Sequence, residues 1–201
     1  MKAKNSFKTA LVTFAICSTI TSCCNEKKAT IPTTKKEIMD AFKAGTLPTS
    51  YVPAAFFVHF DKDHKEGDAA INAHLQYLLK TNADILKVQF EQHVEHIHGL
   101  DNQKNWDNIS PLPKDFYRPT VEIIRKIQEC AGRDIYVMPT VYSAYQVARQ
   151  SLRDENIAKA AVERPDDLKR VLGYYLNSLE WFVKECKKTG IESFYMTTQG
   201  G

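Results

Sequence analysis

The stretch from Tyr51 to Phe90 constrains the fold more than any other part of the chain. It reads YVPAAFFVHF, then a charged turn, then AAINAHLQYLLK and finally NADILKVQF. A near-continuous apolar run is typical of a parallel strand that is covered on both faces. The middle segment repeats apolar residues at helical spacing. The stretch therefore predicts strand, helix and strand, the βαβ unit of an α/β protein.

The rest of the chain continues this alternation. A long polar connection follows the second strand, and connections of this length are usually functional or mobile. We expect four strands, at residues 52–60, 84–90, 135–141 and 191–196. We expect helices at residues 35–43, 67–81, 119–131, 144–162 and 165–188. Strands that alternate with helices indicate a parallel sheet.

A complete (β/α)8 barrel needs about 250 residues, and this chain has 201. The predicted fold is therefore a partial (β/α)8 TIM-type barrel of about four parallel strands, over residues 51–201. Because an open half-barrel leaves strand edges unpaired, we expect self-association or a second chain to complete it, or else a truncated fragment. A small doubly wound sheet is an open alternative. No Gly-rich phosphate loop follows a strand, which argues against a nucleotide site.

The N-terminus has the pattern of an exported lipoprotein. A basic start precedes an apolar run at residues 10–20, as in a secretory signal, and this run is shorter than the roughly 20 residues that span a bilayer. Ile20-Thr21-Ser22-Cys23 resembles a lipobox, with Cys24 as another possible acceptor. We expect a signal peptide over 1–22, lipidation at Cys23, and a tether with a short helix over 23–50. This predicts a protein anchored in the cell envelope by lipid, outside the cytoplasm.

Charge argues against a nucleic-acid partner. The chain carries 27 Lys and Arg against 24 Asp and Glu, a net charge of +3 with no long basic block. Nucleic-acid binding domains normally show a basic patch or stripe. We therefore expect a small-molecule partner and contact with a membrane through the lipid anchor.

Four segments together resemble the N-terminal half of the uroporphyrinogen decarboxylase-like family. They are the proline-led first strand and its charged loop, the strand NADILKV, the strand YVMP and the closing segment that ends in Gln-Gly-Gly, at Val52–Gly67, Asn82–Val88, Tyr136–Pro139 and Gly190–Gly201. The resemblance implies a (β/α)8 barrel with its site at the C-terminal ends of the strands. It implies a tetrapyrrole or other small-molecule substrate and no cofactor.

The resemblance also assigns residues. An aspartate on the second strand steadies the cationic pyrrole in decarboxylase members, and it corresponds to Asp84. Such electrostatic stabilisation is often the largest catalytic effect. Decarboxylases carry two arginines after the first strand, but here the first arginine of the chain is Arg118. His59 in that place is more similar to the methyltransferase-related branch, and we predict Asp84 and His59 as the catalytic residues.

Further polar residues lie near the expected strand ends. We predict that Lys87 holds an anionic substrate, and that Tyr142, Tyr145 and Gln199 help to bind it. An unpartnered barrel-interior lysine would need Asp84 or Glu91 as a counter-charge. A second group, His93, His96 and His98, has ligand chemistry suited to a divalent metal. That group lacks any HExxH or CxxC pattern, so we predict no metal or other cofactor.

Two functions from different classes follow. The first is a uroporphyrinogen decarboxylase-like lyase, or a methyltransferase-like enzyme, that acts at the C-terminal strand ends. The second is an exported lipoprotein without catalysis that binds a porphyrin or another small metabolite. The missing arginines favour the second function, because lysine does not replace arginine in bidentate carboxylate binding.

Overall fold

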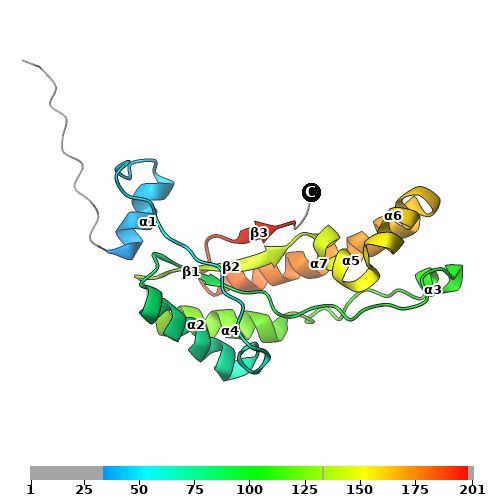
Figure 1. Ribbon diagram of the computed structural model, residues 1–201, viewed down its shortest axis with the longest axis horizontal. Coiled ribbons are helices and arrows are strands. Elements are labelled where there is room, and N and C mark those ends of the chain that lie inside the picture. Colours follow the sequence, from blue (N-terminus) through cyan, green and yellow to red (C-terminus); the bar gives the residue numbers. More distant parts are fainter. Residues whose placement is uncertain (1–33, 133, 199–201) are drawn as a thin grey trace, which may run out of the picture.

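The computed structural model describes residues 34–132 and 134–198. At its centre is a parallel sheet with the order β1-β2-β3, made of β1 (Ile85–Val88), β2 (Tyr136–Tyr142) and β3 (Tyr195–Thr197) (Figure 1). Lys87 is paired with Met138, and Thr140 with Tyr195. Helices connect the parallel strands, so the molecule is an α/β protein as predicted.

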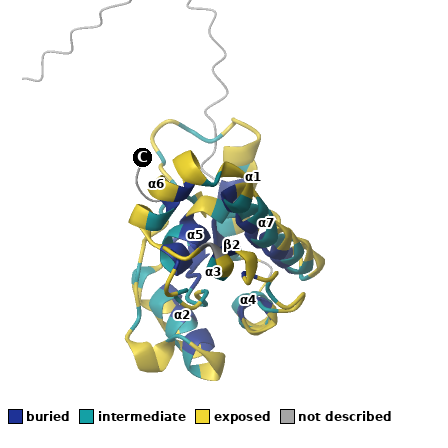
Figure 2. Ribbon diagram, turned by 90° about the vertical axis from the view of Figure 1, so that its right-hand side faces the viewer, coloured by how far each residue is buried: buried dark blue, intermediate teal, exposed yellow. Residues whose placement is uncertain are grey.

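Three helices cover one face of the sheet, α2 (Gly67–Thr81), α4 (Arg118–Ala131) and α7 (Pro165–Lys188). Their buried apolar side chains form one cluster with alternate residues of β1 and β2, namely Leu86, Val88, Val137 and Val141. Residues two apart in a strand share a face, so these four residues define the helix-covered face. Figure 2 shows the buried residues gathered in the middle of the molecule.

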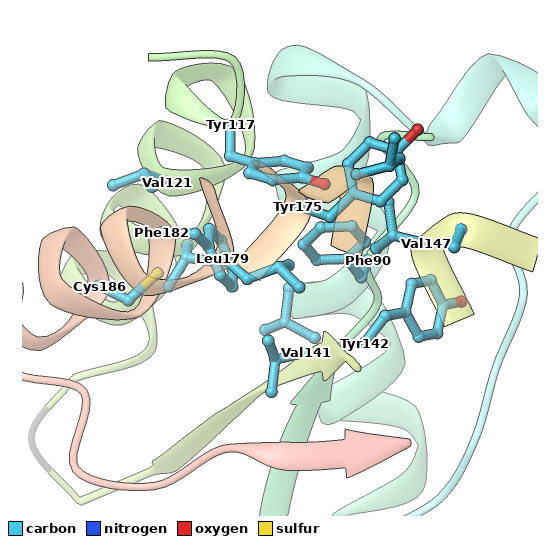
Figure 3. Packing of buried hydrophobic residues seen from close by; sticks show 14 of the residues in the cluster. Phe90, Tyr117, Val121, Val141, Tyr142, Val147, Tyr175, Leu179, Phe182 and Cys186 are labelled. Carbon is cyan, nitrogen blue, oxygen red and sulfur yellow. The ribbon is translucent and has the colours of Figure 1, made fainter. Parts of the chain in front are cut away.

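Aromatic rings fill the centre of this core. The ring of Phe90 lies 5.0 Å from that of Tyr117 and 5.2 Å from that of Phe182, centroid to centroid. Figure 3 shows these rings with residues of α7 above the strands. Each buried side chain of this size contributes about 1.5–3 kcal/mol relative to an exposed one. The predicted apolar stripe of the last helix thus packs on the sheet as part of one core.

Other elements lie at the two ends of the strands. Before the sheet lies α1 (Lys35–Lys43), which begins with a capping box between Thr34 and Glu37 and has the predicted bounds. Beyond the C-terminal end of β2 lie α5 (Ala144–Leu152) and α6 (Asp154–Glu163). We predicted one helical region there, but Arg153 has a left-handed φ of 68° and interrupts it, because that conformation does not continue a right-handed helix.

The predicted first strand, residues 52–60, is wrong. These residues form an extended segment with no strand pairing, and we call residues 51–60 the strap. Among the described residues, Ala54 alone joins the strap to the sheet by backbone–backbone hydrogen bonds: Asp84 N and Ile85 N both donate to Ala54 O, at 3.0 and 3.2 Å. Its apolar side chains are largely exposed, with Phe57 at 52%. Within the described residues the sheet therefore has three strands and not four, and these residues do not form a closed barrel.

The connection after β1 is more ordered than the sequence suggested. It contains the short helix α3 (Gln103–Asp107). A separate 3₁₀ turn, η1 (Lys62–His64), lies earlier in the chain, between the strap and α2. Trp106 of α3 is 1% exposed and donates from Nε1 to Leu100 O at 2.7 Å. Arg170 of α7 donates to Trp106 O at 2.8 Å. A buried tryptophan with both contacts holds this segment on the body of the protein.

Candidate ligand site on the far face of the sheet

The far face of the sheet, away from α2, α4 and α7, carries polar side chains at its centre. Alternation places Lys87 and Gln89 there, and the Lys87 ammonium donates to Gln89 Oε1 at 3.4 Å. On β2 the same face carries Thr140, which is paired with Tyr195 of β3. The pairing of Val88 with Pro139 places Gln89 next to Thr140. Lys87, Gln89, Thr140 and Tyr195 therefore converge on one place.

Lys87 is the most unusual residue of this face. Its side chain is buried, with only 4% exposure, and its Nζ lies 3.1 Å from the centroid of the Phe57 ring and 4.6 Å from that of Tyr195. Aromatic faces attract a cation, but they do not neutralise it. Loss of water around the ammonium lowers the pKa of Lys87 to about 8.

No carboxylate within the described residues forms an ion pair with Lys87. Asp84 and Glu91 were the carboxylates that could supply a counter-charge if no ligand did, and both bind other groups. Buried charges in proteins are normally paired. The lysine is therefore a cation with no protein counter-charge in the part of the chain that the structure describes.

Two neighbours of Lys87 each have one side-chain atom without a hydrogen-bond partner among the described residues. Gln89 Nε2 and Thr140 Oγ1 are buried and have no partner among the described residues. Buried polar atoms are bonded in the large majority of cases, and an unbonded one costs about 1–3 kcal/mol. One cation and two unused donors at one place form an arrangement that can receive an oxygen-bearing anion.

His59 lies beside Glu91, three residues beyond the end of β1. Its Nδ1 is 3.4 Å from Glu91 Oε1, and Lys65 Nζ is 2.9 Å from Glu91 Oε2. Burial by itself would raise the pKa of Glu91, but the hydrogen bonds and charges of Lys65 and His59 outweigh it and hold that pKa below its usual value. Glu91 is thus an ionised group that ties the strap to the C-terminal end of β1.

Asp84 lies at the opposite end of β1 from Glu91. Its Oδ1 accepts from the Tyr51 hydroxyl at 2.7 Å, and its Oδ2 accepts from Ala54 N at 2.8 Å. A carboxylate that accepts two such bonds is a fixed structural group. The structure therefore does not bring Asp84 together with His59, and places it where it fastens the strap.

The two predicted tyrosines differ in position. Tyr142 is buried in the core, where its ring lies 5.2 Å from that of Phe90. Tyr145, on α5, is 45% exposed. Gln199 and Cys23 lie outside the described residues, so the predicted substrate contact and the predicted lipidation stay predictions. Of the described helices, none combines the length and the apolar character needed to cross a bilayer.

The three histidines after β1 have other partners. His93 Nδ1 is 3.0 Å from Gln150 Oε1, and His96 Nδ1 is 2.8 Å from Ser151 O. The rings of His96 and His98 lie edge to face, 4.3 Å apart. Within residues 34–132 and 134–198, no three His, Cys, Asp or Glu side chains gather as metal ligands would.

His74 joins the helix layer to the end of β1. The buried ring donates from Nδ1 to Ala70 O at 2.7 Å and accepts from Gln89 N at Nε2, at 3.2 Å. This arrangement requires the neutral ring with its proton on Nδ1. His74 therefore has the structural role that its place on the apolar side of the helix indicates, and it sets the backbone position of Gln89.

The stability of the protein should fall as pH falls below 6.5, and His74 should account for part of that fall. Burial lowers the pKa of His74, outweighing the bond to Ala70 and the charge of Glu91 that raise it, and Lys87 lowers it further. The unfolded chain thus binds a proton first, so the stabilisation is complete above the unfolded pKa of about 6.5 and is lost as pH falls through the folded pKa. Urea unfolding at pH 7.5 and 5.0 measures this.

The matched variant for this test is His74→Gln, which keeps a donor and an acceptor but does not titrate. We expect the variant to lose less stability than the natural protein between pH 7.5 and 5.0. The other histidines are common to both proteins and cancel in the comparison. Equal losses in the two proteins would show that the buried ring has no such role.

A cavity of about 450 Å³ borders the same strand end on the helix side. It lies between the starts of α2 and α4, and its walls include Ile71, Ile123, Gln89, Glu91 and Lys65. Its volume is within the range of small-molecule sites. The segment Gln89–Glu91 thus lies between this cavity on the helix side and the polar site around Lys87 on the far face.

Comparison with known proteins supports the fold. No protein-family model and no curated protein matches the sequence. Among solved structures, a methyltransferase from Methanosarcina mazei matches with a TM-score of 0.61 at 13% identity, over 80% of this chain and 58% of that chain. At this identity the match shows the fold alone, which is mixed α/β and consistent with part of a TIM-type barrel. The chain spans less than two thirds of the length of that methyltransferase.

Proposed function

We propose that this protein is a divergent uroporphyrinogen decarboxylase-like protein that holds a small carboxylate-bearing molecule against Lys87 on the far face of the sheet. The observation that carries the proposal is the buried ammonium of Lys87, which has no carboxylate partner within the described residues. A ligand carboxylate supplies the missing counter-charge.

The groups around Lys87 suit a carboxylate. An ionised carboxylate has about four lone-pair sites and donates no hydrogen bond. Gln89 Nε2 and Thr140 Oγ1 are donors without a partner among the described residues, and the Lys87 ammonium has donors beyond the one that reaches Gln89 Oε1 at 3.4 Å. Charge-assisted bonds of this type are about twice as strong as neutral ones. Such bonds would lower the cost of burying all three groups.

The position on the fold supports the same proposal. In parallel α/β barrels, ligands bind at the C-terminal ends of the strands, and Lys87 and Gln89 lie at that end of β1. The likeness to a methyltransferase favours the methyltransferase-like branch over classical decarboxylation. Two features disfavour the decarboxylase chemistry. The strap lacks arginine, and Asp84 is already bound by Tyr51 and Ala54.

Binding without catalysis is the second candidate. Two observations favour it. Lys87 and its neighbours can receive an anion, but Asp84, the residue that the resemblance makes catalytic, is bound by Tyr51 and Ala54 away from that site. Incubation with a reduced porphyrinogen separates the candidates. Release of CO2 identifies an enzyme, and binding without release of CO2 identifies a carrier.

Replacing Lys87 should weaken binding of coproporphyrin, a tetrapyrrole with four carboxylates. Loss of one charge-assisted contact costs about 1.5–3 kcal/mol, which corresponds to a rise in Kd of roughly 10- to 150-fold. The variant is Lys87→Met, which keeps the length of the side chain without the charge and should fold normally, since replacing a buried charge by an apolar group is often neutral or stabilising. Titration followed by the porphyrin absorption band measures Kd.

The control is Lys80→Met, which removes an exposed lysine near the end of α2. We expect it to leave Kd within about twofold, because exposed charges contribute little. Equal binding by the natural protein and Lys87→Met would contradict the proposal. Equal weakening in both variants would show that binding depends on overall charge and not on this site.

A further inference from the structure

We infer that Lys87 also reacts covalently: its amine forms an imine with an aldehyde or ketone group of the ligand, under cover of the Phe57 ring. This deepens the proposed function by naming a carbonyl compound as the substrate class. It rests on that proposal in one respect, the location of the ligand at Lys87.

The surroundings of Lys87 keep its amine available as a nucleophile. An amine that is protonated has no lone pair, and a protein carboxylate paired with Lys87 would hold it protonated before any ligand arrives. Instead two aromatic rings and one amide oxygen surround the amine, and desolvation lowers its pKa. Lysines in apolar pockets are activated for attack on carbonyl groups in this way.

Other lysines with shifted pKa values lack this combination. Lys36 and Lys43 contact Asp40 and Glu192, which raise their pKa values. The pKa of Lys35 is lowered by burial, but its ammonium donates to Ala83 O at the other end of β1. Lys87 is therefore the lysine of the described residues that best suits the reaction.

Phe57 forms a removable cover over the amine. Between Ala54 and Asp61 the strap makes no backbone hydrogen bond with any described residue. Phe57 is held by its ring contacts with Lys87 and Tyr195, the latter 5.4 Å between centroids. Side chains hold the strap at His59 and Phe60, which contact Glu91 and His74. A movement of Phe57 alone would open the amine to a ligand.

The reaction is balanced without any further reagent. The neutral Nζ attacks the carbonyl carbon, a C–N bond forms and the carbonyl electron pair moves to oxygen, which takes one proton from the attached nitrogen to give the carbinolamine. The hydroxyl then takes the second proton of that nitrogen and leaves as water, while the nitrogen lone pair forms the C=N bond. Gln89 Nε2 and Thr140 Oγ1 are unpartnered donors among the described residues and can stabilise the oxygen that develops negative charge.

Reductive trapping tests the inference. The full-length protein is incubated at pH 7 with glyoxylate, a carboxylate-bearing aldehyde, and cyanoborohydride, and labelled lysines are quantified by peptide mass spectrometry. An ordinary lysine has a pKa of about 10.4, so only a small fraction is neutral at pH 7. We expect Lys87 to be labelled roughly tenfold or more faster than Lys80 in the same sample, because a lower pKa leaves more free amine even after its lower nucleophilicity is counted.

Two variants sharpen the test. Phe57→Ala should speed labelling of Lys87 and leave Lys80 unchanged, because only Lys87 lies beneath that ring. Lys87→Arg keeps the charge and should still bind coproporphyrin, but no imine should form at position 87. Labelling of Lys87 no faster than Lys80, in both the natural protein and Phe57→Ala, would overturn the imine. If coproporphyrin binding persisted in that case, the proposed anion site would stand without it, and loss of both would overturn both.

Discussion

Phe182→Ala should lower the free energy of unfolding of this protein by about 3–5 kcal/mol. The side chain is fully buried and contacts Phe90, Tyr117 and Phe194 between α7 and the sheet. Removing a buried phenylalanine ring costs about 3–5 kcal/mol, and whole domains are stable by only about 5–15 kcal/mol. Urea unfolding followed by circular dichroism measures the loss.

The control for this prediction lies on the same helix. Leu176 is 50% exposed on α7, and Leu176→Ala should cost no more than about 1 kcal/mol. Both variants introduce alanine into the same helix, but only Phe182 is buried. A larger loss for Phe182→Ala therefore reports the packing of its side chain and not a change in helix propensity. A small effect of Phe182→Ala would mean that α7 does not pack on the sheet as described.

Asp84→Asn should release the strap and destabilise the protein by about 1.5–3 kcal/mol, the usual value of hydrogen bonds to a charged group. The reason is that the variant has one acceptor oxygen instead of two, and Tyr51 and Ala54 N bind different carboxylate oxygens. Tyr51→Phe should reproduce part of the loss, and the double variant should lose less than the sum, because both changes break one shared contact.

The same variant separates the two interpretations of Asp84. The geometry makes it a structural residue, whereas the family resemblance makes it catalytic. If Asp84→Asn retained full stability but lost binding or turnover, the catalytic interpretation would be favoured. Lower stability with binding retained at saturating ligand would support the structural one.

The helices were predictable because their patterns are local. The bounds of α1 and α2 agree with the sequence prediction, and α4 and α7 start at or next to the predicted proline. The strap was not predictable, although its residues are mostly apolar. A strand exists only when a neighbour accepts its backbone hydrogen bonds, and here Ala54 alone makes them. The sequence of residues 51–60 does not show whether a neighbouring strand pairs with them.

The site was predictable only in part, for a similar reason. Lys87 was recognised as an anion partner, because a lysine within an apolar strand is unusual. Gln89 and Thr140 were missed, although Gln89 is two residues from Lys87 and so shares its face. Thr140 joins them through the pairing of β1 with β2. The partners of Glu91 depend on where the strap crosses, which the sequence does not specify.

The state of the Lys87 amine tests the central claim most directly. Its ¹³Cε chemical shift, assigned by comparison with Lys87→Arg, is followed by NMR from pH 6 to 11. We predict a midpoint near 8 for Lys87, below the value of about 10.4 for a lysine in water, and a higher midpoint once coproporphyrin is bound. A midpoint near 10.4 that the ligand does not move would mean a solvated or paired ammonium, and would contradict the site described for the far face.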